Sequence, residues 1–148
     1  MAAGQMIAAL LRFGVGALFV YAGAVKIADP QQFALDVHHY QLTSFTVSVL
    51  VATYLPWLEF CAGLALIARR FTLGAPLALA GMMLAFIAAL ASAWMRGLDI
   101  ACGCFGREAD AIRTNFPALI ARDAVLFAAV LVLLVIEARR PPPPSDRG

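Results

Sequence analysis

Two cysteines separated by one glycine are the residues best suited to chemistry: Cys102, Gly103 and Cys104, within the stretch LDIACGCFGREAD. A disulfide between residues two apart requires a bend at the middle residue, which glycine permits. Such a disulfide is expected to be strained and exposed. Disulfides of that kind usually take part in thiol–disulfide exchange, whereas structural disulfides are unstrained. Phe105 follows as an apolar contact for the membrane surface, and Gly106 as a second flexible point. The motif predicts a redox-active thiol pair.

Two other interpretations of this motif remain open. A structural disulfide here would close almost no loop and would contribute little stability. A metal site is the stronger alternative, because two thiolates are soft ligands for Cu(I), Zn or Hg and because His38 and His39 are predicted on the same side of the membrane. However, the third cysteine, Cys61, lies within a predicted helix, so no further cysteine on that side completes a four-thiolate set. The residues favour exchange over metal binding.

The composition is that of an integral membrane protein. Hydrophobic residues make up 63% of the 148 residues and charged residues 14%, and the mean hydropathy is +0.86. Soluble domains contain about 45–50% apolar and about 25% charged residues. The net charge of +2 is small and scattered, which argues against nucleic-acid binding.

Four apolar stretches are long enough to cross about 30 Å of hydrocarbon. They cover approximately residues 6–27, 47–68, 74–94 and 116–137. We therefore predict an all-α, integral membrane four-helix bundle at residues 1–138, followed by a Pro-rich, disordered cytoplasmic tail at residues 139–148.

Positive residues at the helix ends predict the orientation. Arg69 and Arg70 link the second and third spans, and Arg139 and Arg140 follow the fourth. Because cytoplasmic loops are enriched in Lys and Arg, both termini are predicted inside and the cysteine loop between the third and fourth spans outside. Disulfides persist in that compartment.

A short segment after the first span is predicted to lie at the outer membrane interface. Residues 33–45 are too few and too polar to span the bilayer. We predict an interfacial helix in which Phe33, Tyr40 and Phe45 reach into the apolar layer.

Ionisable residues inside the spans are costly and are usually paired or functional. With Lys26 placed at the outer boundary and Arg69 at the inner one, a rise of about 1.5 Å per residue brings Arg12 and Glu59 to similar depths. We therefore predict a buried Arg12–Glu59 ion pair between the first two long helices.

The first span also carries two seven-residue repeats. Arg12, Phe19 and Lys26 form one and Gly16 and Gly23 the other, so both sets fall near one stripe of the helix. The glycines are expected to let another helix pack closely against that stripe.

The same depth calculation places Arg122 and Asp123 of the last span near Lys26, just beneath the cysteine loop. A cation there would favour thiolate over thiol, or could hold a quinone oxygen. We predict these residues to support the cysteines, and by analogy with other four-helix thiol oxidoreductases we predict a quinone site among Lys26, Trp57, Trp94 and Arg122. Alternatively, Lys26 and Arg122 extend to the lipid headgroups and Asp123 pairs with one of them.

Together these residues resemble the MauE/DoxX family of redox-associated four-helix membrane proteins, over approximately residues 8–137. The matching positions are Arg12, Gly16, Phe19, Gly23 and Lys26, then Pro56, Glu59 and Gly63 in LPWLEFCAGLALI, then CGCFG, then Arg122. Where relatives often have Arg-Asn, this chain has Arg122-Asp123.

The resemblance implies a redox-associated role at the membrane. MauE-type members of the family act with a thioredoxin-like partner in maturation of the disulfide-rich small subunit of methylamine dehydrogenase, and similar proteins also occur outside methylamine metabolism. We therefore predict a multi-pass protein of the bacterial inner membrane whose Cys102 and Cys104 exchange disulfides with a periplasmic thioredoxin-like protein. The alternatives are a heavy-metal (Cu, Zn or Hg) binding or transport protein and a non-catalytic membrane scaffold.

Overall fold

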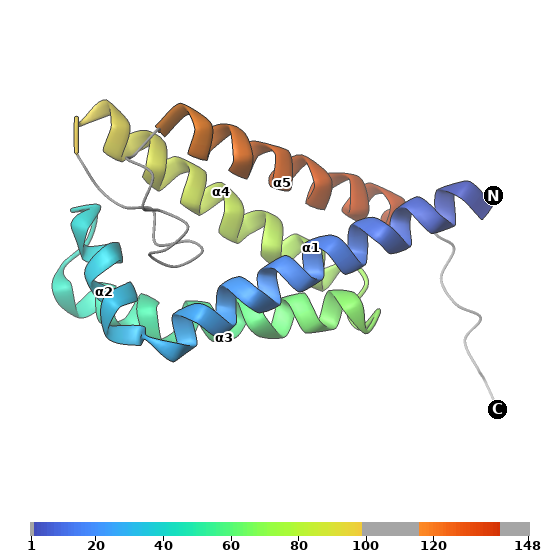
Figure 1. Cartoon of the computed structure of the whole chain (residues 1–148), viewed down its shortest axis with the longest axis horizontal. Coiled ribbons are helices and arrows are strands. Elements are labelled where there is room, and N and C mark those ends of the chain that lie inside the picture. Colours follow the sequence, from blue (N-terminus) through green and yellow to red (C-terminus); the bar gives the residue numbers. More distant parts are fainter. Residues whose placement is uncertain (1, 99–115, 140–148) are drawn as a thin grey trace.

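A computed structural model describes residues 2–98 and 116–139, and these residues form five α-helices and no strand (Figure 1). The helices are α1 (Ala2–Ala28), α2 (Pro30–His39), α3 (Phe45–Ile67), α4 (Gly74–Met95) and α5 (Phe116–Ala138). All except α2 are long and apolar enough to cross a membrane. The predicted all-α class with four spans is confirmed, and the predicted spans agree with the helix ends to within a few residues.

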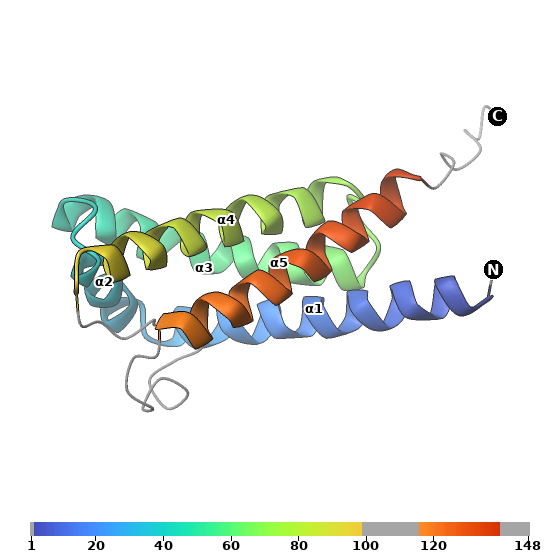
Figure 2. The same ribbon diagram turned by 90° about the horizontal axis from the view of Figure 1, so that it is seen from above.

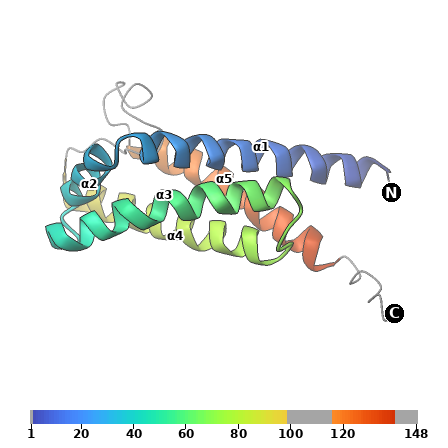
Figure 3. The same cartoon turned by 90° about the horizontal axis from the view of Figure 1, so that it is seen from below.

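The helices pack as two pairs. α1 lies against α3 over most of its length, as Figure 3 shows, and α4 lies against α5. α5 crosses obliquely over the bundle from the α2 end (Figure 2). The start of α1, the turn between α3 and α4, and the end of α5 all lie at one end of the bundle, opposite α2 (Figure 1). That end therefore gathers the basic turn at Arg69 and Arg70 with Arg139.

Glycines bring the backbones of α1 and α3 into direct contact. A Cβ atom added at Gly23 would lie 2.8 Å from the backbone nitrogen of Phe60 and from the carbonyl oxygen of Pro56. One added at Gly63 would lie 2.8 Å from the carbonyl oxygen of Gly16. Small residues of this kind let transmembrane helices approach closely and gain dispersion contacts. The predicted role of Gly16 and Gly23 is confirmed.

The predicted stripe on α1 faces the interior. Arg12, Phe19 and Lys26 are only 5%, 6% and 4% exposed. The apolar core beside them combines residues of all four long helices: Val15, Ala62, Leu66, Leu79, Met83, Val130 and Leu133. Two charged side chains of α1 are thus enclosed in an apolar bundle, so each requires a partner.

Local signals explain where α2 begins. Asp29 precedes it, and the Asp29 carboxylate accepts a hydrogen bond of 3.0 Å from the backbone N–H of Gln32. Pro30 occupies the first turn, where its missing N–H costs nothing. The helix therefore covers residues 30–39 instead of the predicted 33–45.

The predicted membrane anchors of this segment are largely wrong. Phe33 and Tyr40 are 3% and 6% exposed and pack inside the protein, whereas Phe45, at the start of α3, is 53% exposed. The reason is that α2 folds back onto α3, where Phe33 meets Ala52 and Leu55. Apolar residues that face a neighbouring helix are buried by it and do not reach the lipid.

Candidate functional site

A buried ion pair joins α1 to α3 near the α2 end of the bundle. The Lys26 ammonium donates to both carboxylate oxygens of Glu59, at 2.9 and 2.7 Å. Their side chains are only 3% and 2% exposed. The ammonium also lies 5.1 Å from the ring centroids of Phe33 and Phe86, close enough for cation–π attraction. This pair is therefore shielded from solvent and held from three helices.

A second carboxylate approaches this pair from α5. Asp123 is 4% exposed and accepts a 3.0 Å hydrogen bond from the neighbouring Arg122. Lys26, Glu59 and Asp123 line one cavity of about 30 Å³. Since a water molecule needs about 10–15 Å³ of such space, the cavity can hold water that links the three groups. We call Lys26, Glu59 and Asp123 the buried ionic cluster.

The cluster refines the predicted supporting residues. The structure brings together Lys26 and Asp123, as predicted, and adds Glu59. Arg122 binds Asp123 while its side chain remains 32% exposed, which matches the alternative prediction that Asp123 pairs with a neighbouring cation. Lys26, in contrast, does not extend to the headgroups, because Glu59 holds it inside the bundle.

The predicted Arg12–Glu59 pair is wrong in its partners. Glu59 binds Lys26, and the Arg12 guanidinium forms a buried salt bridge with Glu137 of α5. Sequence reasoning missed Glu137 altogether. The available signal was an acidic residue at the end of an apolar helix, two residues before Arg139.

The register between α1 and α3 explains this correction. Gly23 lies against Pro56 and Phe60, which places Glu59 at about the level of residue 22 of α1. Arg12 lies ten residues farther along, or about 15 Å away along the helix axis. The prediction assumed that Lys26 marks the membrane boundary, whereas its side chain points into the bundle.

The predicted quinone site among Lys26, Trp57, Trp94 and Arg122 is not assembled. Trp57 and Trp94 are 56% and 52% exposed, on outer faces of α3 and α4, while Lys26 is enclosed. Cys61 also lies on the outer face of α3, in a shallow groove beside Trp57, and is not a core residue. Lipid-facing aromatic residues are ordinary in membrane helices.

The cysteine motif lies outside the described residues, as do all five of its predicted positions, Cys102, Gly103, Cys104, Phe105 and Gly106. Its two flanks are described. Leu98, after α4, and Phe116, at the start of α5, both pack in one apolar cluster around Tyr40 of the α2 end. The segment that carries the cysteines therefore leaves and re-enters the bundle at the end where α2 lies.

Among the described residues, the two histidines of the alternative metal site are not gathered with other metal-binding side chains. Within residues 2–98 and 116–139, no three His, Cys, Asp or Glu side chains come together as a metal site would require. The His38 ring packs edge-on against Phe45, with 5.4 Å between the ring centroids, and His39 is exposed.

Comparison with known proteins places these features in a family. The family described as "Methylamine utilisation protein MauE" matches residues 4–136. A curated relative, "Methylamine utilization protein MauE" of Paracoccus denitrificans, is 33% identical over 96 residues, which cover 64% of this chain and 52% of the relative. The chain thus matches about half the length of that relative. No solved structure matches the chain. The chain that forms this multi-pass bundle therefore belongs to the MauE family.

Proposed function

We propose that this protein is a membrane thiol–disulfide redox protein in which Cys102 and Cys104 exchange disulfides with a periplasmic thioredoxin-like partner. The observation that carries the proposal is the CGC motif in a segment whose two flanks pack together at the α2 end of the bundle. We further propose a methylamine dehydrogenase-type protein as the client of this protein, which the family's description as a methylamine utilisation protein supports.

The surroundings of this segment support redox chemistry. Cys102 is four residues from Leu98, so the chain allows at most about 14 Å between them. Arg122 lies six residues after Phe116, about 9 Å below the start of α5. The partly exposed Arg122 guanidinium and the buried ionic cluster therefore lie beneath the end that carries the cysteines. A cation close to a cysteine favours thiolate, the nucleophile in disulfide exchange, and the partly exposed Arg122 is a candidate for this role even though Asp123 is its ion-pair partner.

The exchange reaction predicts a trapped partner. In Cys102→Ser or Cys104→Ser, the remaining thiol lacks its resolving partner, so one of the two variants should accumulate a mixed disulfide with a thioredoxin-like protein. The adduct should appear as a larger band on a non-reducing gel of membrane proteins, disappear on reduction, and be identified by mass spectrometry.

Cys61→Ser is the matched control, since Cys61 lies on the outer face of α3. The trapping variants should be made in this background and should still form the adduct, whereas removal of both loop cysteines should abolish it. If no variant traps a partner and the wild-type protein retains stoichiometric metal through dialysis, the protein is a metal-binding protein and the proposed exchange is wrong.

The proposed orientation places both termini in the cytoplasm and the cysteines in the periplasm of the bacterial inner membrane. Its support is the clustering of the Arg69–Arg70 turn with the end of α5, because positive residues concentrate on the cytoplasmic side (Figure 1).

A membrane-impermeant maleimide tests this orientation. After mild reduction of intact cells in the Cys61→Ser background, Cys102 and Cys104 should be labelled. The control is Arg70→Cys in a variant without other cysteines, because this turn lies at the opposite end of the bundle. The cysteine at position 70 should react only after the membrane is permeabilised, which exposes its cytoplasmic face to the maleimide. The reverse labelling pattern would exclude a periplasmic redox role.

A further inference from the structure

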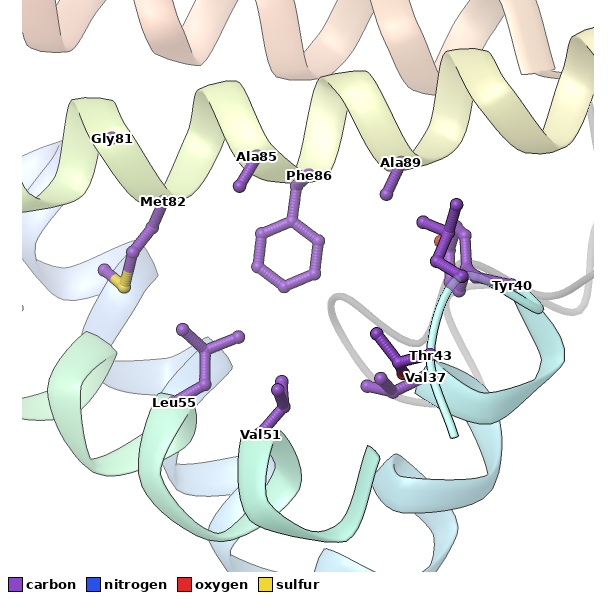
Figure 4. A pocket seen from close by; sticks show the side chains of 11 residues that line it. Val37, Tyr40, Thr43, Val51, Leu55, Gly81, Met82, Ala85, Phe86 and Ala89 are labelled. Atoms are coloured by element: carbon purple, nitrogen blue, oxygen red, sulfur yellow. The ribbon is translucent and has the colours of Figure 1, made fainter. Parts of the chain in front are cut away.

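An apolar pocket separate from the buried ionic cluster lies between α2, α3 and α4. Its volume is about 350 Å³, within the range of about 300–1,000 Å³ that is typical of small-molecule sites. The pocket forms because α3 and α4 meet at their short turn and diverge toward the α2 end (Figure 1). Figure 4 shows Phe86 projecting from α4 toward Leu55 and Val51 of α3, with Tyr40 and Thr43 at the α2 end.

The pocket opens on the outer face of the bundle. Gly81 and Ala85 of α4 line it and are themselves exposed. A Cβ atom added at Gly81 would meet no other atom within 4 Å, so there is open space beside this residue. Since α3 and α4 are both membrane-spanning by length and hydropathy, a ligand can enter sideways from the hydrocarbon layer.

The lining of the pocket favours a neutral, largely apolar ligand. The lining is almost entirely apolar; Tyr40 and Thr43 add hydroxyl groups, and the Thr43 hydroxyl forms a 3.1 Å hydrogen bond with the hydroxyl of Ser48. Arg96 contacts this part of the pocket, but it donates to the backbone carbonyl oxygens of Tyr40, Gln41 and Ser92. Its guanidinium is therefore engaged by the protein, and a phospholipid phosphate would have to displace these bonds.

The position of the pocket links it to the redox end of the bundle. Tyr40 lines the pocket and also packs in the cluster that holds Leu98 and Phe116, the two flanks of the cysteine segment. Phe86 lines both this pocket and the small cavity of the buried ionic cluster. One aromatic ring thus separates the apolar pocket from the Lys26 ammonium.

We propose that this pocket binds an isoprenoid quinone, which accepts the electrons of the reduced cysteine pair; this acceptor role rests on the proposed thiol–disulfide function. A quinone is neutral, its ring is flat and largely apolar, and its isoprenoid tail can leave through the open side into the bilayer. In the reaction, two S–H bonds break and one S–S bond forms. The two electrons and two protons released by the thiols convert both quinone carbonyl groups to hydroxyl groups.

Filling the pocket tests this proposal with a matched pair of variants. Gly81→Leu places a side chain in the pocket, whereas Gly14→Leu makes the same change at an exposed α1 position where an added Cβ also meets nothing within 4 Å. The full-length chain, in nanodiscs of bacterial phospholipids, is cross-linked with a photoreactive azido-ubiquinone in competition with decylubiquinone. Labelled peptides are quantified by mass spectrometry.

We expect labelling of α3 and α4 peptides around the pocket, reduced about tenfold in Gly81→Leu and unchanged in Gly14→Leu. The rate at which decylubiquinone reoxidises the pre-reduced protein should fall in parallel. If Gly81→Leu does not fold, Ala85→Leu fills the same space from the next turn of α4. Partner trapping by the cysteine variants should persist when Gly81→Leu is added.

Three outcomes would overturn the quinone site: equal labelling of all variants, labelling concentrated in the groove beside Trp57 and Cys61, or a co-purifying phospholipid that Gly81→Leu displaces while quinone labelling is unaffected. A different result would contradict the proposed function alone. If quinone labels the pocket in the wild-type protein but no cysteine variant ever traps a partner, the pocket is a quinone site and the exchange reaction is wrong.

Discussion

Lys26→Met should lower the free energy of unfolding by about 3–5 kcal/mol, because it leaves the Glu59 carboxylate buried without its cation. Glu59 is 2% exposed, and both of its carboxylate oxygens accept hydrogen bonds from Lys26. The ammonium also lies 5.1 Å from the ring centroids of Phe33 and Phe86, so its removal costs these contacts as well. Reversible unfolding of the purified protein in mixed detergent micelles, followed by circular dichroism, measures the change.

The double variant Lys26→Met with Glu59→Leu should recover much of this loss, since an apolar pair of similar volume carries no uncompensated charge. Arg70→Met, in the exposed turn between α3 and α4, is the matched control and should change stability by less than about 0.5 kcal/mol. A cycle between Arg12→Met and Glu59→Leu should show little coupling, because these residues belong to different pairs. Strong coupling there, with none between Lys26 and Glu59, would refute the observed pairing.

Gly23→Leu should be about as destabilising. It should lower the free energy of unfolding by about 3 kcal/mol or prevent assembly of the bundle. A Cβ atom added at Gly23 would lie only 2.8 Å from the α3 backbone, and backbone atoms cannot move aside as a flexible side chain can. α1 and α3 must therefore separate, which weakens the largest interhelical contact in the protein. The measurement is again unfolding in micelles, together with expression in membranes.

Gly14→Leu provides the comparison, because it lies on the same helix and an added Cβ meets nothing within 4 Å. Leucine is favoured over glycine in helices by somewhat less than about 1 kcal/mol, so this variant should be neutral or slightly stabilising. If Gly14→Leu and Gly23→Leu lower the free energy of unfolding equally, the close approach of α1 and α3 does not stabilise the bundle.

Much of the architecture could be predicted from the sequence because it depends on local composition. Long apolar runs define the four spans, since every stretch that crosses the hydrocarbon must satisfy its backbone hydrogen bonds as a helix. The seven-residue repeat of Arg12, Phe19 and Lys26 also predicted which face of α1 is buried, because residues at that spacing lie close to one stripe of a helix. Gly16 and Gly23 indicated close packing for the same reason.

The sequence by itself thus determined which segments are helices, which face of α1 is buried and which types of residue need partners. Only the tertiary structure decided which partners they have. Lys26 binds Glu59 and Arg12 binds Glu137 because backbone contact at Gly23 and Gly63 sets the register of α1 against α3, and because α5 crosses back over α1. Likewise, Phe33 and Tyr40 are buried, and a pocket opens beside Phe86, because α2 folds into the space between diverging helices. Helical periodicity specifies the direction of a side chain around its own axis, whereas its neighbour depends on how whole helices fit together, and that fit depends on side-chain volumes far apart in the chain.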